Sequence, residues 1–171
     1  MFKYFTILLG FLILNCTSSS EKKNVKNTST NKVNLLKKES ISKLKFNDII
    51  LDNSAKKLTQ EWKSYALINE AILDLKNFKF SFFTKEKDIF NTTLIELKTT
   101  IPEALNSQPI KSRVLVLQNQ LYRFQEELTI KKQLRKDDIV FIKDVFVALS
   151  NLNLQINKKL EKEAQQILKP Q

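Results

Sequence analysis

Six apolar residues in the second half of the chain recur at spacings of four, three, four, three and four. They are Ile110, Val114, Leu117, Leu121, Phe124 and Leu128. This alternation places all six on one side of an α-helix and forms a seam of three heptads. Ser107 precedes the seam as an N-cap, and Pro109 falls in the first turn, where a helix tolerates proline. The pattern predicts a long helix whose apolar side packs against other helices.

Three further stretches have helical periodicity and start signals of their own. The first begins at a cap provided by Asn53 or Ser54 and runs to about Asn77, and Asn69 within it is interpreted as a hydrogen-bonded core residue that sets helix register. Thr84 caps the second, which extends to or kinks at 100–102, and Asp137 or Asp138 starts the last. The residues expected to face inward are Leu58, Trp62, Tyr65, Ala66, Ile72 and Leu75; Ile89, Phe90, Thr93, Leu94 and Leu97; and Ile142, Val145, Leu149, Leu152, Ile156 and Leu160.

Turn residues are too scarce for a fold that needs many tight turns, because the 171 residues include one glycine and three prolines. The sequence therefore predicts an all-α domain over 46–171, built as an antiparallel bundle of about four helices. The short links fall near 78–84, 105–108 and 129–137. Three helices with a fourth on the periphery are the alternative.

The inventory of reactive side chains excludes most catalytic chemistry. The chain has no histidine, one cysteine and one glycine, so imidazole catalysis, His or Cys metal sites and glycine phosphate loops are ruled out. We expect no cofactor and no metal. Glu70 and Asp74, at positions i and i+4, can share a helix face as an acid and base pair or as cation ligands. A solvated helix face is the preferred interpretation, so we expect a protein that is not an enzyme, with carboxylate-only catalysis as the alternative.

The first residues resemble a secretory signal. Lys3 precedes an apolar run from Tyr4 to Leu14, and these 11 residues are too few to span a bilayer of about 30 Å. Their number suits the apolar core of a signal peptide, which we assign to 1–15.

The apolar run ends in Ile13-Leu14-Asn15-Cys16, which resembles the lipobox of bacterial lipoprotein precursors. The resemblance implies a diacylglyceryl group on the Cys16 thiol, cleavage after Asn15 and acylation of the new N-terminus, with palmitate among the chains. The mature protein would then be a lipid-anchored component of the cell envelope. Thr17 is not the aspartate that retains some lipoproteins at the inner membrane, so we favour the periplasmic face of the outer membrane where two membranes exist. An uncleaved apolar anchor with an incidental cysteine is the alternative.

Residues 16–45 are predicted to be a flexible, basic tether. Eight lysines and two glutamates lie between residues 21 and 47. These lysines can contact anionic lipid headgroups, or they can simply keep a solvated spacer extended. Arginine is scarce and most of the basic charge lies outside the folded domain, so we expect no nucleic-acid partner. The segment 33–46 either forms a short amphipathic helix on the domain or on lipid, or stays unstructured.

Phenylalanine is concentrated at the first predicted link. Phe78, Phe80, Phe82 and Phe83 lie within six residues. The cluster either plugs the end of the bundle as core, which we favour, or forms an exposed patch that contacts a partner, expected to be another envelope protein.

Overall fold

The computed structural model describes residues 34–84 and 87–167. Its helices are α1 (Lys38–Ser42), α2 (Asn53–Thr59), α3 (Lys63–Lys76), α4 (Ser81–Thr84), α5 (Lys87–Thr99), α6 (Gln108–Lys131) and α7 (Ile139–Ile167), with 3₁₀ turns η1 (Glu103–Leu105) and η2 (Lys136–Asp138). Within these residues one isolated bridge, Leu35 with Arg135, is the only β-type pairing. The predicted all-α class is confirmed.

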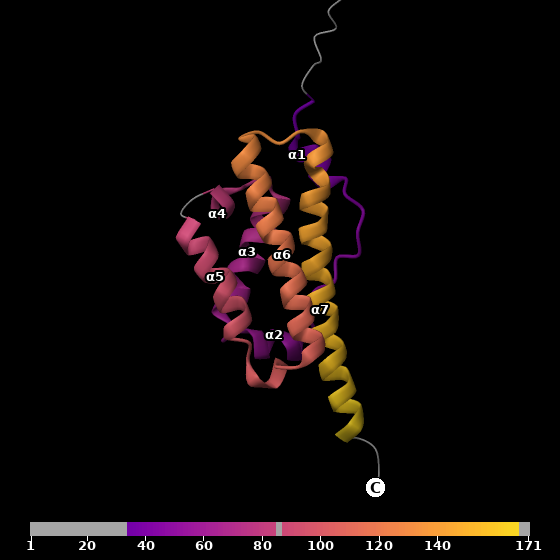
Figure 1. The fold of residues 1–171 in the computed structure, drawn as a ribbon. Coiled ribbons are helices and arrows are strands. Elements are labelled where there is room, and N and C mark those ends of the chain that lie inside the picture. The colour runs from indigo at the N-terminus through magenta and orange to yellow at the C-terminus, as the bar shows by residue number, and fades with distance from the viewer. Residues whose placement is uncertain (1–33, 85–86, 168–171) are drawn as a thin grey trace, which may run out of the picture. The chain divides into compact units, whose positions relative to one another are not determined.

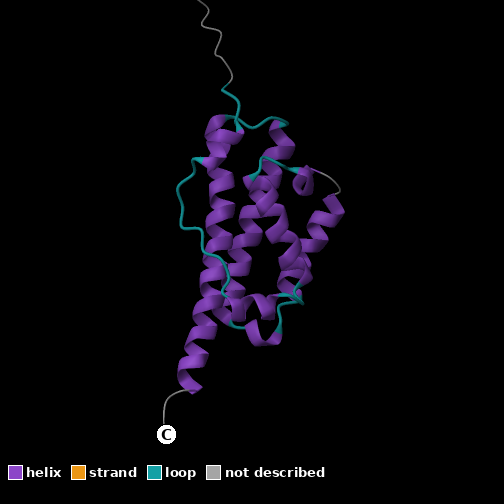
Figure 2. Ribbon diagram, turned by 180° about the vertical axis from the view of Figure 1, so that it is seen from behind, coloured by secondary structure: helices purple, strands orange, loops and turns teal. Residues whose placement is uncertain are grey.

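Helices α3, α5, α6 and α7 are the long elements, and each packs against two of the others. Helix α6 contacts α5 and α7, while α3 contacts the same two helices. Figures 1 and 2 show these helices side by side, with the chain reversing direction from each one to the next. Their inward faces enclose one continuous hydrophobic core.

The apolar seam of α6 is buried as predicted. Ile110, Val114, Leu117, Leu121 and Phe124 have no exposed surface, and Leu128 is half-buried. Helix α7 likewise buries the predicted stripe that begins at Ile142, with Leu160 half-buried at its end. The segment 136–165 is also long and apolar enough to cross a membrane, but half of the 18-residue stretch within it that meets this criterion is buried inside the protein.

The first predicted helix is wrong in its continuity, because the chain breaks between α2 and α3. The Thr59 hydroxyl donates a hydrogen bond to Ala55 O at 3.0 Å. The backbone bonds of Gln60 and Trp62 then reach back three residues instead of four, as in a 3₁₀ turn, and the helix ends. The break allows α2 to lie across one end of the long helices (Figure 1). Trp62, at the start of α3, is fully buried and stacks on Tyr65 with ring centroids 5.2 Å apart.

The cap of this first helix is Asp52 rather than Asn53 or Ser54. Its carboxylate accepts hydrogen bonds from Ala55 N and from the Ser54 hydroxyl, each at 2.8 Å. These two bonds, the first of them the stronger influence, hold the pKa of Asp52 below its usual value. The prediction was off by one residue because several adjacent polar residues can cap a helix.

Three predicted positions near the second helix and on α3 are also corrected. Thr84 closes α4 instead of capping α5, and its hydroxyl donates to Phe80 O at 3.2 Å. Ile89 is 55% exposed and Ala66 is exposed, although both were expected to face inward. Their neighbours Phe90 and Tyr65 are buried, so the inward faces of α5 and α3 are narrower than the predicted stripes.

The packed structure begins earlier than residue 46. Leu36 and Ile41 are 6% and 4% exposed, and the ring of Phe46 lies 5.3 Å from that of Phe146 on α7. Residues 36–46 therefore belong to the folded unit as a short helix with flanking loops, one of the forms considered for 33–46. The tether assigned to 16–45 overlaps this packed segment, because sparse apolar residues gain burial only from a surface that the rest of the chain provides.

Replacing Leu36 or Ile41 by alanine should lower the free energy of unfolding by about 2 kcal/mol or more, because each side chain is buried against the core. The matched control is Leu35→Ala, since Leu35 is 41% exposed. We expect it to change stability by less than about 0.5 kcal/mol. Urea unfolding measures all three. Equal, small losses would return residues 34–45 to the tether.

Candidate functional site

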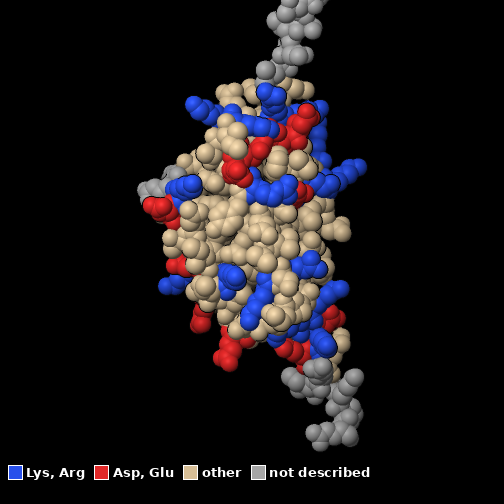
Figure 3. Space-filling model, viewed as in Figure 1, with Lys and Arg blue, Asp and Glu red and all other residues tan. Residues whose placement is uncertain are grey.

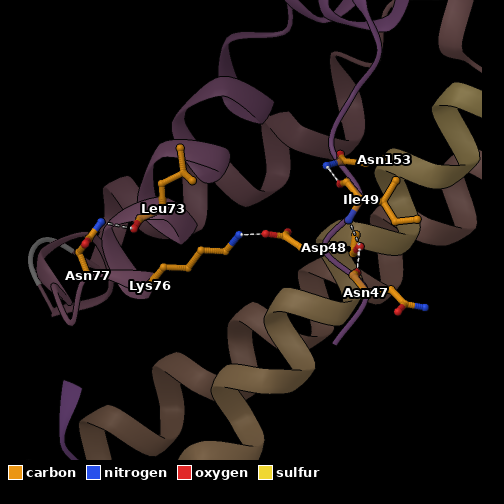
Figure 4. A network of polar contacts seen from close by, with 8 residues as sticks. Asn47, Asp48, Ile49, Leu73, Lys76, Asn77 and Asn153 are labelled. Carbon is orange, nitrogen blue, oxygen red and sulfur yellow. Dashed lines mark hydrogen bonds and ion pairs between the residues drawn. The ribbon is translucent and has the colours of Figure 1, made fainter. Parts of the chain in front are cut away.

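Residues 47–52, here called the strap, run without helix beside α7 and are held there by side chains. Ser150 Oγ accepts a hydrogen bond from Ile49 N at 2.7 Å and donates one to Asn47 O. Asn153 Nδ2 donates to Ile49 O at 2.9 Å (Figure 4). Polar side chains of α7 therefore replace the backbone partners that an extended segment would find in a sheet.

A third residue of α7 continues this row. Asn157 Nδ2 donates to Ile50 O at 2.9 Å, and Asn157 Oδ1 accepts from Asp52 N at 3.1 Å. Ser150, Asn153 and Asn157 are three and four residues apart, so they lie on one face of the helix. Because they bond to backbone atoms, they fix the course of the strap irrespective of its side chains.

Asn153 also links the strap to the core. The Tyr65 hydroxyl donates to Asn153 Oδ1 at 2.7 Å. Burial raises the pKa of Tyr65 well above its usual value, and the hydrogen bond to Asn153 offsets only part of that effect. Asn153, and not Asn69, is thus the bonded core amide that was expected in the first predicted helix. Asn69 itself is half-buried, and its side chain makes no hydrogen bond to the described residues.

An open groove of about 510 Å³ lies between the strap, α2, α3 and α7. Its apolar lining includes Ile50 and Leu73, which are 70% and 50% exposed. Lys76 Nζ on α3 and Asp48 Oδ2 in the strap form an ion pair at 2.6 Å (Figure 4). The groove is a mostly apolar surface with polar residues at its edge.

The two carboxylates considered for catalysis lie in different surroundings. Glu70 is exposed at the edge of the groove, and Asp74 is half-buried and pairs with Lys79 at 3.2 Å. Among the described residues no group of three or more Asp, Glu, His or Cys side chains could hold a metal ion. The positions of these two residues are those of a solvated helix face.

The phenylalanine cluster at the junction of α3, α4 and α5 is packed into the core. Phe83 is 3% exposed, and its ring centroid lies 4.9 Å from that of Phe124. Phe78, Phe80 and Phe82 are half-buried against the same core. Their remaining exposed edges are the part of the cluster that a partner could contact.

The backbone at the end of α3 turns the chain back toward this core. Phe78 has a φ of 65°, a left-handed conformation that glycine adopts more easily than other residues. Lys79 N donates to Asp74 O at 3.0 Å, which satisfies a carbonyl at the helix end. Burial of the aromatic rings offsets the cost of this turn.

A second groove, of about 770 Å³, has Phe83 and Tyr122 in its lining.

Two predicted functional segments lie outside the described residues. They are Cys16 with its preceding apolar run, and the tether lysines at 22, 23, 26 and 32. Four further lysines of the predicted tether are described and exposed. They are Lys37, Lys38, Lys43 and Lys45.

A scan of protein-family models, a search of curated proteins and a search of solved structures each found no match to this chain.

Replacing Asn153 by alanine should lower the free energy of unfolding by about 1 to 3 kcal/mol, because the Tyr65 hydroxyl and Ile49 O both lose their partner. Asn69→Ala is the matched control and should have an effect below about 0.5 kcal/mol. Chemical unfolding followed by circular dichroism compares the two variants. A larger loss in Asn69→Ala would restore Asn69 as the residue that sets register.

Proposed function

We propose that this protein is a lipid-anchored lipoprotein of a bacterial cell envelope whose helical domain binds or supports another envelope component without catalysis. The observation that carries the proposal is the position of the chain's single cysteine, directly after Ile13-Leu14-Asn15 and an apolar run of signal-peptide length. Two or three acyl chains, at about 0.8 kcal/mol per buried CH₂, hold a protein on a membrane without a spanning helix.

The chemistry of the remaining chain supports a binding or structural role. After residue 16 the chain contains no histidine, cysteine or glycine. The alternative, an enzyme that uses carboxylates alone, gains no support from Glu70 and Asp74, because one is exposed and the other pairs with Lys79. The periplasmic face of an outer membrane is the proposed location where the source has two membranes.

The proposed anchor predicts that Cys16→Ala abolishes labelling by a fatty-acid analogue in cells and moves the protein to the soluble fraction. A matched control moves the thiol, as Cys16→Ala combined with Ser19→Cys. This variant should also stay unlabelled, because the residue three positions before the new cysteine is then alanine at 16, instead of a branched aliphatic residue such as Ile13. Labelling of Cys16→Ala at the wild-type level would refute the anchor.

The half-exposed phenylalanines are the proposed contact for an envelope partner. Phe83→Ser should lower stability by about 3 to 5 kcal/mol, because the whole ring is buried. Phe82→Ser should cost less, since Phe82 is only half-buried, and it should reduce crosslinking to the partner in intact envelopes while the protein stays folded. Unchanged crosslinking with folded Phe82→Ser would remove this surface from the proposal.

A further inference from the structure

The first described residues are fixed against the link between α6 and α7. Leu36 N donates to Leu134 O at 2.9 Å, and Lys136 N donates to Asn34 O at 2.8 Å. These two bonds join segments that are about a hundred residues apart in sequence. The described chain therefore begins at one end of α6 and α7, beside the link between them; this place is the point of entry into the folded unit (Figure 1).

Five exposed cations lie on these two joined segments, and together they define the basic end of the domain. They are Lys37, Lys38, Lys132, Arg135 and Lys136. None of the five forms an ion pair with another described residue. The exposed acids of the same segments are Glu39 and Asp137, so the cations are in excess.

Three neighbouring charged groups pair with one another instead of offsetting these cations. Asp138 is 5% exposed and accepts hydrogen bonds from Lys131 Nζ at 2.6 Å and from Arg135 N at 2.7 Å. Lys131 also pairs with Glu127. Burial alone would raise the pKa of Asp138, but these bonds and the nearby positive charges together lower it. Asp138 thus remains ionised and directed inward.

The charges of the domain are unevenly distributed along its helices. Figure 3 shows Lys and Arg gathered toward the two ends of the visible face, with a largely uncharged middle. Electrostatic attraction in physiological salt falls off over about 8 Å, whereas the 24 residues of α6 span about 36 Å. A charged surface can therefore attract one end of this domain at a time.

We propose that the basic end lies against anionic lipid headgroups. This proposal rests on the lipid anchor at Cys16 and names the surface by which the anchored domain meets its membrane. The 17 residues between Cys16 and Asn34 extend at most about 60 Å, so an anchored Cys16 holds Asn34 within that distance of the bilayer.

The test uses the lipidated full-length protein in vesicles that contain phosphatidylglycerol and phosphatidylcholine, with an energy-transfer acceptor on the headgroups. The donor is attached through Gln133→Cys at the basic end, or through Gln108→Cys at the other end of α6; both positions are exposed. Transfer should be about twofold or more higher from position 133, and the difference should shrink in high salt and on phosphatidylcholine alone.

A charge-reversal pair tests which cations are responsible. Lys37→Glu, Lys132→Glu and Lys136→Glu combined should abolish the difference between the two donor positions. Lys57→Glu, Lys98→Glu and Lys111→Glu combined make the same change in net charge away from the basic end and should preserve it. Circular dichroism confirms that both variants are folded.

Equal transfer from the two donors on anionic vesicles would overturn the proposal, and so would equal losses in the two triple variants. A difference that persists on phosphatidylcholine alone would also exclude anionic headgroups as the ligand. Mass spectrometry of the purified protein separates these failures from that of the anchor. Protein without acyl chains refutes the lipoprotein, whereas acylated protein without a difference in transfer refutes the basic end alone.

Discussion

The rest of the structure depends on α7, because this helix packs an apolar face into the core and bonds the strap through a polar face. One side of this helix buries Ile142, Val145 and Leu152 against the other long helices, and another presents Ser150, Asn153 and Asn157 to the strap. Asn153 serves both, because it bonds the strap backbone and the buried Tyr65 hydroxyl. A buried polar group without a partner lowers the free energy of unfolding by more than a typical hydrogen bond raises it. The position of the strap and the packing of the core therefore depend on each other.

A chain nearly free of glycine has to end its helices in another way. Phe78 after α3 and Lys132 after α6 both adopt positive φ, and the described residues contain no glycine that could take this conformation. At each position the contacts made just after the turn offset the backbone cost. After Phe78 the aromatic junction packs on Phe124, and after Lys132 the link folds back so that Leu134 O and Lys136 N bond the first described residues.

The hydrogen bonds of the segment 34–52 relate the fold to the proposed anchor. The segment 34–52 is bonded at the link between α6 and α7 and again along the row of polar residues on α7, so it is held at two separate places on the folded unit. The point of entry carries the five exposed cations together with exposed Leu35, Ile130 and Val140, while the exposed Ile50 and Leu73 line the groove beside the strap. An anchored domain of this kind can meet its membrane and a partner through different surfaces.

The sequence by itself determined the all-α class, the extents of α6 and α7 within a few residues and most of their buried faces, because helix formation and the 3.6-residue period are local properties. It could not determine that Ile89 and Ala66 are exposed, because burial at the edge of a stripe depends on which helices lie beside it. It assigned the register amide to Asn69 in place of Asn153, whose bond to Ile49 joins residues 104 apart. The break before Trp62, the packing of Leu36 and Ile41, and the joining of two basic segments were decided by tertiary structure, because each requires a surface or a partner that only the folded chain supplies.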